Sequence, residues 1–303
     1  MKAPQKKLLA WYSVHGRAAL PWRHSRNPYD VLVSEFMLQQ TQVDRVIPKY
    51  EAFLAAFPDF ATLARASTAD VLRAWKGLGY NSRAIRLKRI AQIVCAEFGG
   101  ILPAVEATLR RLPGVGAYTA AAVRAFAFHA DVVALDTNIR RVLHRVVHGM
   151  EYPVVANAQQ LALDAARLLP AGRAHDWNSA LMDLGATICT ARAPKCALCP
   201  LHPVCEAAPV DAATLEQNRL RYAARKSPQE AIPFEQTTRF ARGKIVDRLR
   251  ALPPGAAISL LDLQLEMNTI LPPHSLGGIE NTLKALERDG LVRRNGEAFA
   301  LTD

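Results

Sequence analysis

Four of the five cysteines lie close together, at the spacing C-x6-C-x2-C-x5-C formed by Cys189, Cys196, Cys199 and Cys205. Four thiolates so close in sequence can surround one compact centre, and thiolates suit zinc or an iron–sulfur cluster. Zinc is the less favoured alternative, because structural zinc sites usually come as two C-x2-C pairs separated by a longer loop. The spacing therefore predicts a metal centre. Cys95, in the helical stretch IAQIVCAEF, is expected to be a core residue.

Two carboxylates, Glu35 and Asp136, lie in or next to apolar runs. Glu35 interrupts the apolar run of SEFMLQQTQV, and burial among Phe36, Met37 and Leu38 would raise its pKa, as a general acid requires. Taken alone, it could equally be a buried, satisfied helix acid. Asp136 ends the apolar run of VVALDTNIRRVLHR, where Asp is a favoured helix N-cap and would need no other role. Chemistry at either acid therefore depends on the other motifs.

A glycine-containing turn separates two helical stretches in LRRLPGVGAYTAAAVRAFAF. The turn consists of Pro113, Gly114, Val115 and Gly116, and a new helix is expected to begin at about Ala117. Glycines allow turn conformations and a close approach to a ligand, while a helix N-terminus presents N–H groups to an anion. The segment predicts a phosphate-binding turn, although a bare helix turn would be commonplace.

The elements around these motifs are almost all helices. From about residue 6 to residue 201, apolar residues recur at spacings of three and four, and strand-like alternation is missing. Breakers such as NPYD, GLGYNS and FGGILP recur roughly every 15 to 25 residues, which predicts about ten helices. A polar, proline-containing stretch then follows Cys205 and is expected to be a linker.

A smaller unit resumes at about Arg239. Asn295-Gly296 is a strong turn dipeptide between two short apolar runs and predicts a hairpin. Three helices followed by such a hairpin are typical of a winged helix. The expected elements are helices over 241–252, 259–267 and 276–289, and strands over 291–294 and 298–301.

The charge of the chain favours a polyanionic partner. Lys and Arg number 38 against 27 Asp and Glu, giving a net charge of +11 and a pI near 9.7. Nucleic acid is preferred to a membrane surface because the arginines form short groups and no terminal polybasic tail. No apolar stretch has signal-peptide or membrane-helix length. We expect a cytoplasmic monomer without a nucleotide cofactor.

Together, these motifs resemble the helix-hairpin-helix DNA glycosylases of the endonuclease III superfamily. The cysteine loop matches the [4Fe-4S] loop of that family, and LPGVGAYTA looks like its hairpin, which grips the DNA backbone without reading sequence. The resemblance, over roughly residues 6–206, implies an all-α glycosylase fold, and the sequence pattern after it adds a winged-helix-like α+β domain. The expected domains are a six-helix domain (21–130), an iron–sulfur cluster domain (1–20 and 131–208), a linker (209–238) and the winged-helix-like domain (239–303).

Within the superfamily, SEFMLQQTQV, LPWR and GLGYNSRA are similar to MutY-type adenine glycosylases. This resemblance implies that Glu35 is the general acid that protonates adenine and that Asp136 stabilises an oxocarbenium-like sugar. Asn138 matches a family position that supports the site. Tyr118 stands where bifunctional relatives carry a lysine, and because a phenol cannot form an imine, the enzyme is expected to be monofunctional.

The resemblance also implies contacts with double-stranded DNA that holds a mispaired or damaged base. Extruding the base leaves a gap in the duplex, and Gln40 and Tyr80 match the family's residues that wedge into it. Arg23 matches a residue near the adenine pocket. The remaining expected DNA-binding residues are Gln39, Thr41, Pro113, Gly114, Val115 and Gly116.

Three readings stay open in the sequence. Many MutY proteins recognise 8-oxoguanine with a β-rich C-terminal domain, which residues 239–303 do not resemble, so we expect activity on adenine opposite guanine or 8-oxoguanine. Thymine or uracil glycosylases acting on mispairs with guanine share the fold, and the twin glutamines favour adenine over them. A catalytically silent DNA-binding protein is disfavoured because a binder needs neither Glu35 nor Asp136.

Overall fold

The computed structural model describes residues 1–149, 156–224, 233–271 and 278–303. The chain forms two compact units, each assembled from segments that are distant in sequence. None of the described helices is long and apolar enough to cross a membrane. The first unit contains residues 1–32, 104–111 and 115–229, and the second contains residues 33–103, 112–114 and 230–303.

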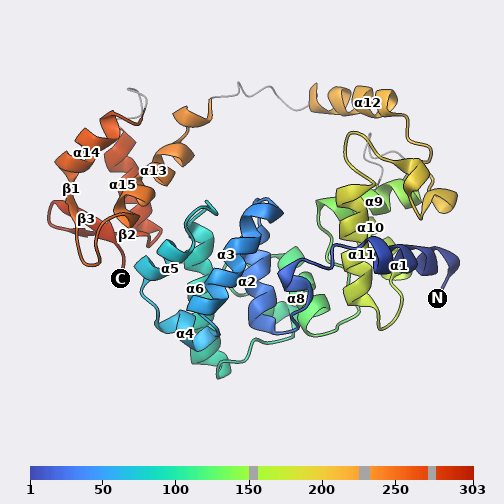
Figure 1. Ribbon diagram of the computed structural model, residues 1–303, viewed down its shortest axis with the longest axis horizontal. Helices are drawn as coiled ribbons and strands as arrows, with labels where there is room; N and C mark the ends of the chain where they lie inside the picture. Colours follow the sequence, from blue (N-terminus) through green and yellow to red (C-terminus); the bar gives the residue numbers. More distant parts are fainter. Residues whose placement is uncertain (150–155, 225–232, 272–277) are drawn as a thin grey trace. The chain divides into compact units, whose positions relative to one another are not determined.

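The first unit is helical, and its core lies between α1, α9 and α11. Figure 1 shows α1 beside α11, although the two helices come from opposite ends of the unit's sequence. Leu8, Ile139, Trp177 and Leu184 are among the buried residues of this core. The helices are α1 (Ala3–His15), α7 (Glu106–Leu109), α8 (Ala117–Ala127), α9 (Thr137–His148), α10 (Ala158–Leu168), α11 (Ala174–Thr187) and α12 (Ala212–Ala224), with short 3-10 turns η1 (Pro21–Arg23), η2 (Cys196–Leu198) and η3 (His202–Val204).

The second unit begins with a group of helices packed on α6. Residues Ala84, Leu87, Ala91 and Val94 of α6 are fully buried, and their spacing of three and four makes one apolar face. Helices α4 and α5 pack on α6. The helices are α3 (Val43–Ala56), α4 (Phe60–Arg65), α5 (Thr68–Ala74) and α6 (Ser82–Phe98), while α2 (Pro28–Leu38) starts in the first unit and ends in the second.

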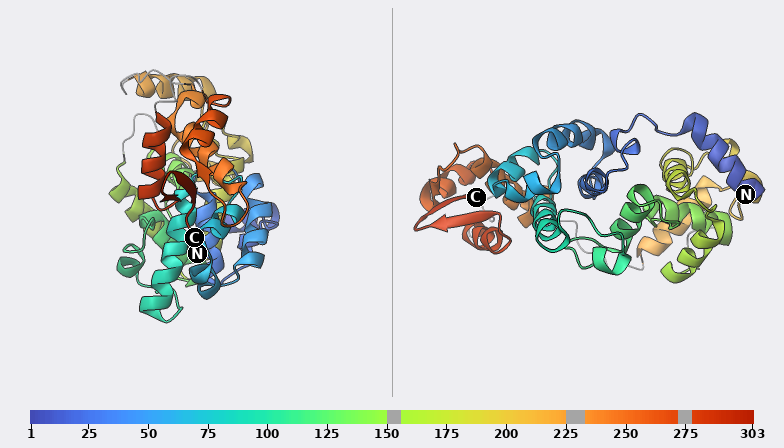
Figure 2. Two further views of the ribbon diagram at one scale, coloured as in Figure 1. Left: turned by 90° about the vertical axis from the view of Figure 1, so that its left-hand side faces the viewer. Right: turned by 90° about the horizontal axis from the view of Figure 1, so that it is seen from below.

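The C-terminal part of the second unit, orange to red in Figures 1 and 2, combines three helices with a small antiparallel sheet. Its strand order is β1-β3-β2, and Val292 pairs with Leu301. Gly296 has a φ of 60°, which explains the glycine in the turn between β2 and β3. The elements are η4 (Phe234–Gln236), α13 (Thr238–Arg250), β1 (Ile258–Ser259), α14 (Leu260–Asn268), α15 (Ile279–Arg288), β2 (Val292–Asn295) and β3 (Ala298–Leu301).

Three details differ from the sequence-based expectations. The hairpin is joined by a third strand, β1, whose two residues are too few to show an alternating pattern. Helix α12 occupies part of the expected linker, capped by Asp211, which accepts a hydrogen bond from the Thr214 backbone N–H at 2.7 Å. Cys95 is half-buried on α6 and is not a core residue. The start of the third expected C-terminal helix, up to residue 277, lies outside the described residues.

Candidate active site

Glu35 lies in the last turn of α2 and is buried, with 6% of its surface exposed. Phe36 and Met37 beside it are fully buried, whereas Leu38 is half-buried. The sequence therefore correctly predicted an acid in an apolar environment. This burial is the feature that chemistry at Glu35 would require.

Two loops of the second unit contain residues in the left-handed conformation. Gln40, just beyond α2, has a φ of 55°, and Tyr80, just before α6, has a φ of 44°. For a residue with a side chain this conformation costs on the order of 1–3 kcal/mol, and it persists only where the surrounding structure holds it. Gln40 is exposed, and Gln39 before it is half-buried. Such strain clusters at functional sites, and both strained residues are ones that the sequence predicts to contact DNA.

The ring of Tyr80 is in contact with the C-terminal part of the same unit. The guanidinium of Arg239 lies 3.8 Å from the centre of the Tyr80 ring. Next to Tyr80, Asn81 accepts a hydrogen bond of 3.0 Å from Arg250, whose side chain is buried. Tyr80 is therefore half-buried, and its ring would have to leave Arg239 before it could enter a duplex.

The turn before α8 contains one glycine that steric constraints require. Gly114 has a φ of 82°, and a Cβ there would lie 2.9 Å from Arg86 Cδ and 3.4 Å from the Phe36 ring. Gly116 is different, since it is the extended N-cap of α8, and no described atom lies within 4 Å of a Cβ built on it. Pro113 is half-buried and Val115 is buried. The backbone at Gly116 is thus open to a close approach by a ligand.

Asp136 is the N-cap of α9. Its carboxylate accepts a hydrogen bond of 2.6 Å from the Ile139 backbone N–H and one of 2.9 Å from Asn138 Nδ2. The helix N-cap that the sequence predicts at Asp136 is therefore confirmed. An N-cap is compatible with chemistry, because Asp136 is only half-buried and the two hydrogen bonds fix the direction of its carboxylate.

The extended segment that leads to Asp136 is fixed by Asn178. This side chain is fully buried, accepts a hydrogen bond from the Ala134 backbone N–H and donates one to the Val132 carbonyl, both at 2.8 Å. It thus pairs with the segment as a neighbouring strand would. It also donates to the Ala174 carbonyl within its own helix, α11. Asn178 therefore attaches the approach to Asp136 to the core helix of the unit.

Arg141 connects Asp136 to the cysteine loop. Its Nη2 donates to Asn138 Oδ1 at 2.8 Å and to the Gly185 carbonyl at 2.7 Å, and its Nε donates to the Cys189 carbonyl at 2.8 Å. Asn138, in turn, donates to Asp136. A continuous line of hydrogen bonds thus runs from the backbone of the first cysteine to the candidate acid.

Arg23 and Tyr118 belong to the first unit. Arg23 lies in η1, is 9% exposed at its side chain and forms an ion pair of 3.0 Å with the buried Asp183, which also binds Arg17 at 2.7 Å. Nε and Nη1 of Arg23 are buried and have no hydrogen-bond partner among the described residues. Tyr118 is half-buried in the first turn of α8.

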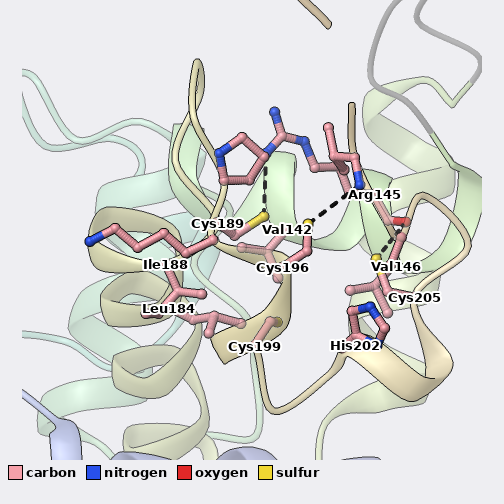
Figure 3. A pocket seen from close by; sticks show the side chains of 14 residues that line it. Val142, Arg145, Val146, Leu184, Ile188, Cys189, Cys196, Cys199, His202 and Cys205 are labelled. Atoms are coloured by element: carbon pink, nitrogen blue, oxygen red, sulfur yellow. Dashed lines mark hydrogen bonds between the residues drawn. The ribbon is translucent and has the colours of Figure 1, made fainter. Parts of the chain in front are cut away.

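The four clustered cysteines line one cavity together with apolar residues of α9 and α11 (Figure 3). All four are half-buried. Arg145 Nη1 lies 3.5 Å from Cys189 Sγ, and the Val210 backbone N–H points to Cys196 Sγ at 3.5 Å. These donors face the sulfurs as they would face thiolates.

Four cysteine sulfurs are ligands that suit an iron–sulfur cluster, although the described side chains are not arranged as a finished metal site. Among the residues described, no group of three or more His, Cys, Asp or Glu side chains converges as metal ligands. Burial raises the pKa of the Cys199 thiol to about 11, and burial also raises the pKa of Cys205. Both would be thiols at neutral pH until a cation stabilises the thiolates.

Sequence reasoning missed the residues that hold the site in place. Arg83, Arg141 and Asn178 bind backbone carbonyls or amides, and a backbone acceptor leaves no pattern of residue types. Gly185 was also missed, since its small size matters only because α9 passes close to it. The one available signal was position, because Arg83 and Arg141 lie in motifs already quoted, GLGYNSRA and LDTNIRR.

Known proteins are similar to this chain in sequence and fold. The family model of the HhH-GPD superfamily base excision DNA repair proteins matches residues 33–153. The adenine DNA glycosylase of Mycolicibacterium smegmatis is 40% identical over 298 residues, covering 97% of this chain and 94% of that protein. The Mycobacterium tuberculosis enzyme of the same name is 38% identical over 301 residues, covering 97% and 92%.

Solved structures agree on the fold. A thermostable thymine-DNA glycosylase is 33% identical, has a TM-score of 0.62 and covers 66% of this chain and 93% of its own. An endonuclease III in a complex with DNA has a TM-score of 0.58 at 19% identity, covering 72% and 95%. The expected superfamily and its mainly helical glycosylase fold are confirmed. The chain belongs to the MutY family of adenine DNA glycosylases within the HhH-GPD superfamily.

Proposed function

We propose that this protein excises adenine mispaired with guanine or 8-oxoguanine from double-stranded DNA, as the first step of base excision repair. One observation carries the choice of adenine, namely the 40% identity to an adenine DNA glycosylase along 97% of the chain. That similarity extends over nearly the whole chain, whereas the match to the thymine-DNA glycosylase covers 66% of it. The basic charge of the chain supports the DNA partner.

In the proposed mechanism, Glu35 donates a proton to a ring nitrogen of adenine, which makes the base a better leaving group. The bond between the base and C1′ breaks, and Asp136 stabilises the positive charge that develops on the sugar. Water then adds to C1′ and gives its proton to the deprotonated Glu35. The burial of Glu35 and the fixed carboxylate of Asp136 support these roles. Asn138 is proposed to orient Asp136.

Strand cleavage is not part of the proposed reaction. Tyr118 occupies the position of the lysine that forms a Schiff base in bifunctional relatives, and a phenol cannot form one. Borohydride should therefore trap no covalent adduct between enzyme and DNA. A trapped adduct would contradict the monofunctional assignment.

The proposed DNA contacts divide into backbone and gap-filling groups. The N-terminus of α8, with Gly116 as an open N-cap, offers amides to a phosphate, and Pro113, Gly114 and Val115 shape that turn. Gln40 and Tyr80 are proposed to fill the gap left by the extruded base, with Gln39 and Thr41 beside them. Arg23 is proposed to border the adenine pocket through its unpaired Nε and Nη1.

We also propose that Cys189, Cys196, Cys199 and Cys205 hold a [4Fe-4S] cluster. The cavity that they share and the donors that face their sulfurs support this. When bound, the cluster supplies positive charge that keeps the four sulfurs as thiolates and fixes the loop. A brown protein that contains iron is expected. A colourless protein rich in zinc would favour the alternative metal.

The decisive experiment is a panel of duplexes with A opposite G, A opposite 8-oxoguanine, T opposite G and U opposite G, with abasic sites revealed by alkali. We expect cleavage at both adenine mispairs and not at T or U. Release of thymine alone would select the function of the 33%-identical thymine-DNA glycosylase. Glu35→Gln, which keeps the size and removes the proton, should abolish release while duplex binding persists.

A further inference from the structure

One buried guanidinium, that of Arg83, lies between the two loops that hold Gln40 and Tyr80. Arg83 is the second residue of α6 and is 4% exposed. Its contacts within the described chain are five backbone carbonyls and one hydroxyl, with aromatic rings beside them. A buried arginine usually pairs with a carboxylate, so this choice of partners is unusual.

Arg83 Nη1 binds the end of α2 and the loop after it. It donates to the carbonyls of Phe36 and Met37 at 2.8 Å each and to the carbonyl of Gln39 at 2.5 Å. The last carbonyls of a helix have no partner within the helix and attract a cation. Arg83 therefore caps the helical turn that contains Glu35.

Arg83 Nη2 binds the other loop. It donates to the carbonyls of Leu78 at 2.9 Å and Gly79 at 3.1 Å, and to Thr41 Oγ1 at 3.0 Å. The Thr41 hydroxyl also reaches the Leu78 carbonyl at 3.4 Å, which joins the two loops a second time. One side chain thus holds both segments from within.

The hydrogen bonds to the Gln39 and Gly79 carbonyls have one feature in common. Gln39 and Gly79 directly precede Gln40 and Tyr80, the two left-handed residues described above. Each hydrogen bond therefore fixes the peptide plane that enters a left-handed residue. Burial lowers the pKa of Arg83 to about 10, which is still far above neutral pH, so the guanidinium stays protonated and keeps all its N–H donors.

We propose that Arg83 is the positioning residue that holds Gln40 and Tyr80 together in the conformations needed to fill the duplex when adenine is extruded. The proposal rests on the proposed function, because it takes these two side chains as the wedges. Arg83 itself would touch neither DNA nor the base. It would act on extrusion, upstream of bond cleavage.

The first test needs no substrate. Hydrogen exchange of the full-length protein is compared for wild type, Arg83→Lys and the control Arg89→Lys, which alters an exposed arginine on the same helix. A lysine keeps the charge but lacks the planar fork that reaches both loops. We expect faster exchange in both loops of Arg83→Lys and in neither loop of the control. Loosening of one loop alone, or of neither, would overturn the proposal.

The second test follows extrusion. In duplexes with 2-aminopurine beside the target adenine, we expect Arg83→Lys to slow the fluorescence rise and single-turnover excision by about ten- to a hundredfold. When the target adenine is an unpaired bulge, no partner is lost and the defect should shrink. An equal defect on paired and bulged substrates would mean general damage and would refute the positioning role.

A milder variant covers the case in which Arg83→Lys does not fold. Thr41→Val keeps the shape but removes one acceptor of Arg83 and the second connection between the loops, so the same two loops should loosen to a smaller extent. If wild type releases no adenine from any duplex, the proposed function is wrong. The exchange experiment would then still decide whether Arg83 holds both loops.

Discussion

Glu35 lies at the end of a helix and Asp136 at the start of one, and an arginine supports each of them in a different way. Glu35 lies in the last turn of α2, where Arg83 binds the carbonyls that follow it. Asp136 begins α9, where Arg141 reaches its carboxylate through Asn138. The first arginine therefore fixes loops beside an acid, whereas the second fixes the acid itself.

This difference separates two kinds of defect. Loss of Arg83 should impair the opening of the duplex, because its partners are the backbone of the two loops. Loss of Arg141 should impair the chemical step, because a displaced Asn138 no longer holds Asp136. An unpaired target base would relieve the first defect and leave the second unchanged. The following predictions test the Asp136 side of this comparison, in order of decreasing effect.

The largest effect is expected for Asp136→Asn. Asparagine is as good an N-cap as aspartate, so α9 and the melting temperature should be nearly unchanged. Only the negative charge is lost, and the charge on the developing oxocarbenium-like sugar loses its stabiliser. We expect single-turnover excision to fall by about a hundredfold or more.

The matched control is Asp59→Asn in the second unit. Asp59 caps α4 in the same way, since its carboxylate accepts a hydrogen bond of 2.7 Å from the Thr62 backbone N–H. It lies in none of the proposed site segments, so excision should stay at the wild-type rate. A wild-type rate in Asp136→Asn itself would reduce Asp136 to a helix cap.

Arg141→Lys should have the next largest effect. A lysine ammonium cannot reach Asn138, Gly185 and Cys189 at once, and a carbonyl left unsatisfied in a buried place costs roughly 1–3 kcal/mol. We expect about a tenfold loss of excision, the same on paired and bulged adenine, together with a lower melting temperature.

Arg140→Lys is the control for that change. Arg140 is the exposed neighbour on α9, and among the described residues its side chain donates to the Leu135 carbonyl, at 3.1 Å. Its replacement should leave excision and melting nearly unaltered. If Arg141→Lys recovered on the bulged substrate, Arg141 would belong with Arg83 and the comparison would be wrong.

Gly185→Ala tests the same region with a smaller change. A Cβ at Gly185 would lie 2.7 Å from Asn138 Cβ and 3.2 Å from its Cα, so α9 and α11 must separate slightly. Overpacking of this kind costs about 1–3 kcal/mol. Because Asn138 moves with α9, excision should fall by a few-fold, measured under single turnover beside a thermal melt.

Gly243→Ala is expected to change the stability in the opposite direction. Gly243 is also a helical glycine, on α13, but no described atom lies within 4 Å of a Cβ built there. Alanine should then stabilise the helix by about 0.5–1 kcal/mol. Destabilisation by both changes would show that the loss at Gly185 is not caused by its contact with Asn138.

These residues also show what the sequence could and could not predict. Glu35 and Asp136 were found because an acid in an apolar run and an acid before a helix are visible as residue types in order. The roles of Arg83 and Asn178 depend on which backbone groups approach them, and these come from up to 47 and 46 positions away. Local pattern contains no such information.

The secondary structure, too, was predictable only in part. Helices and the β2–β3 hairpin follow from periodicity and from Asn295-Gly296, and the described C-terminal helices and the hairpin lie within a few residues of the expected positions. Strand β1 exists because β3 offers a free edge, which only the folded unit creates. Polar residues and prolines suggested a linker after Cys205, but α12 forms within it because the stretch Ala212–Ala224 is rich in Ala, Leu and Arg and has an Asp cap.

The smallest effect concerns pH and the two caps. The hydrogen bond from the Thr62 backbone N–H lowers the pKa of Asp59 below its ordinary value of 3.8. Its contribution to stability is therefore complete above that ordinary value and is lost as the pH falls through the lower, folded-state pKa. Since asparagine does not titrate, the difference in melting temperature between wild type and Asp59→Asn should be constant from neutral pH to about pH 5 and change only below it. A difference that already changed near neutral pH would mean that another group titrates with the cap, and Asp59 would then be an unsuitable control for Asp136.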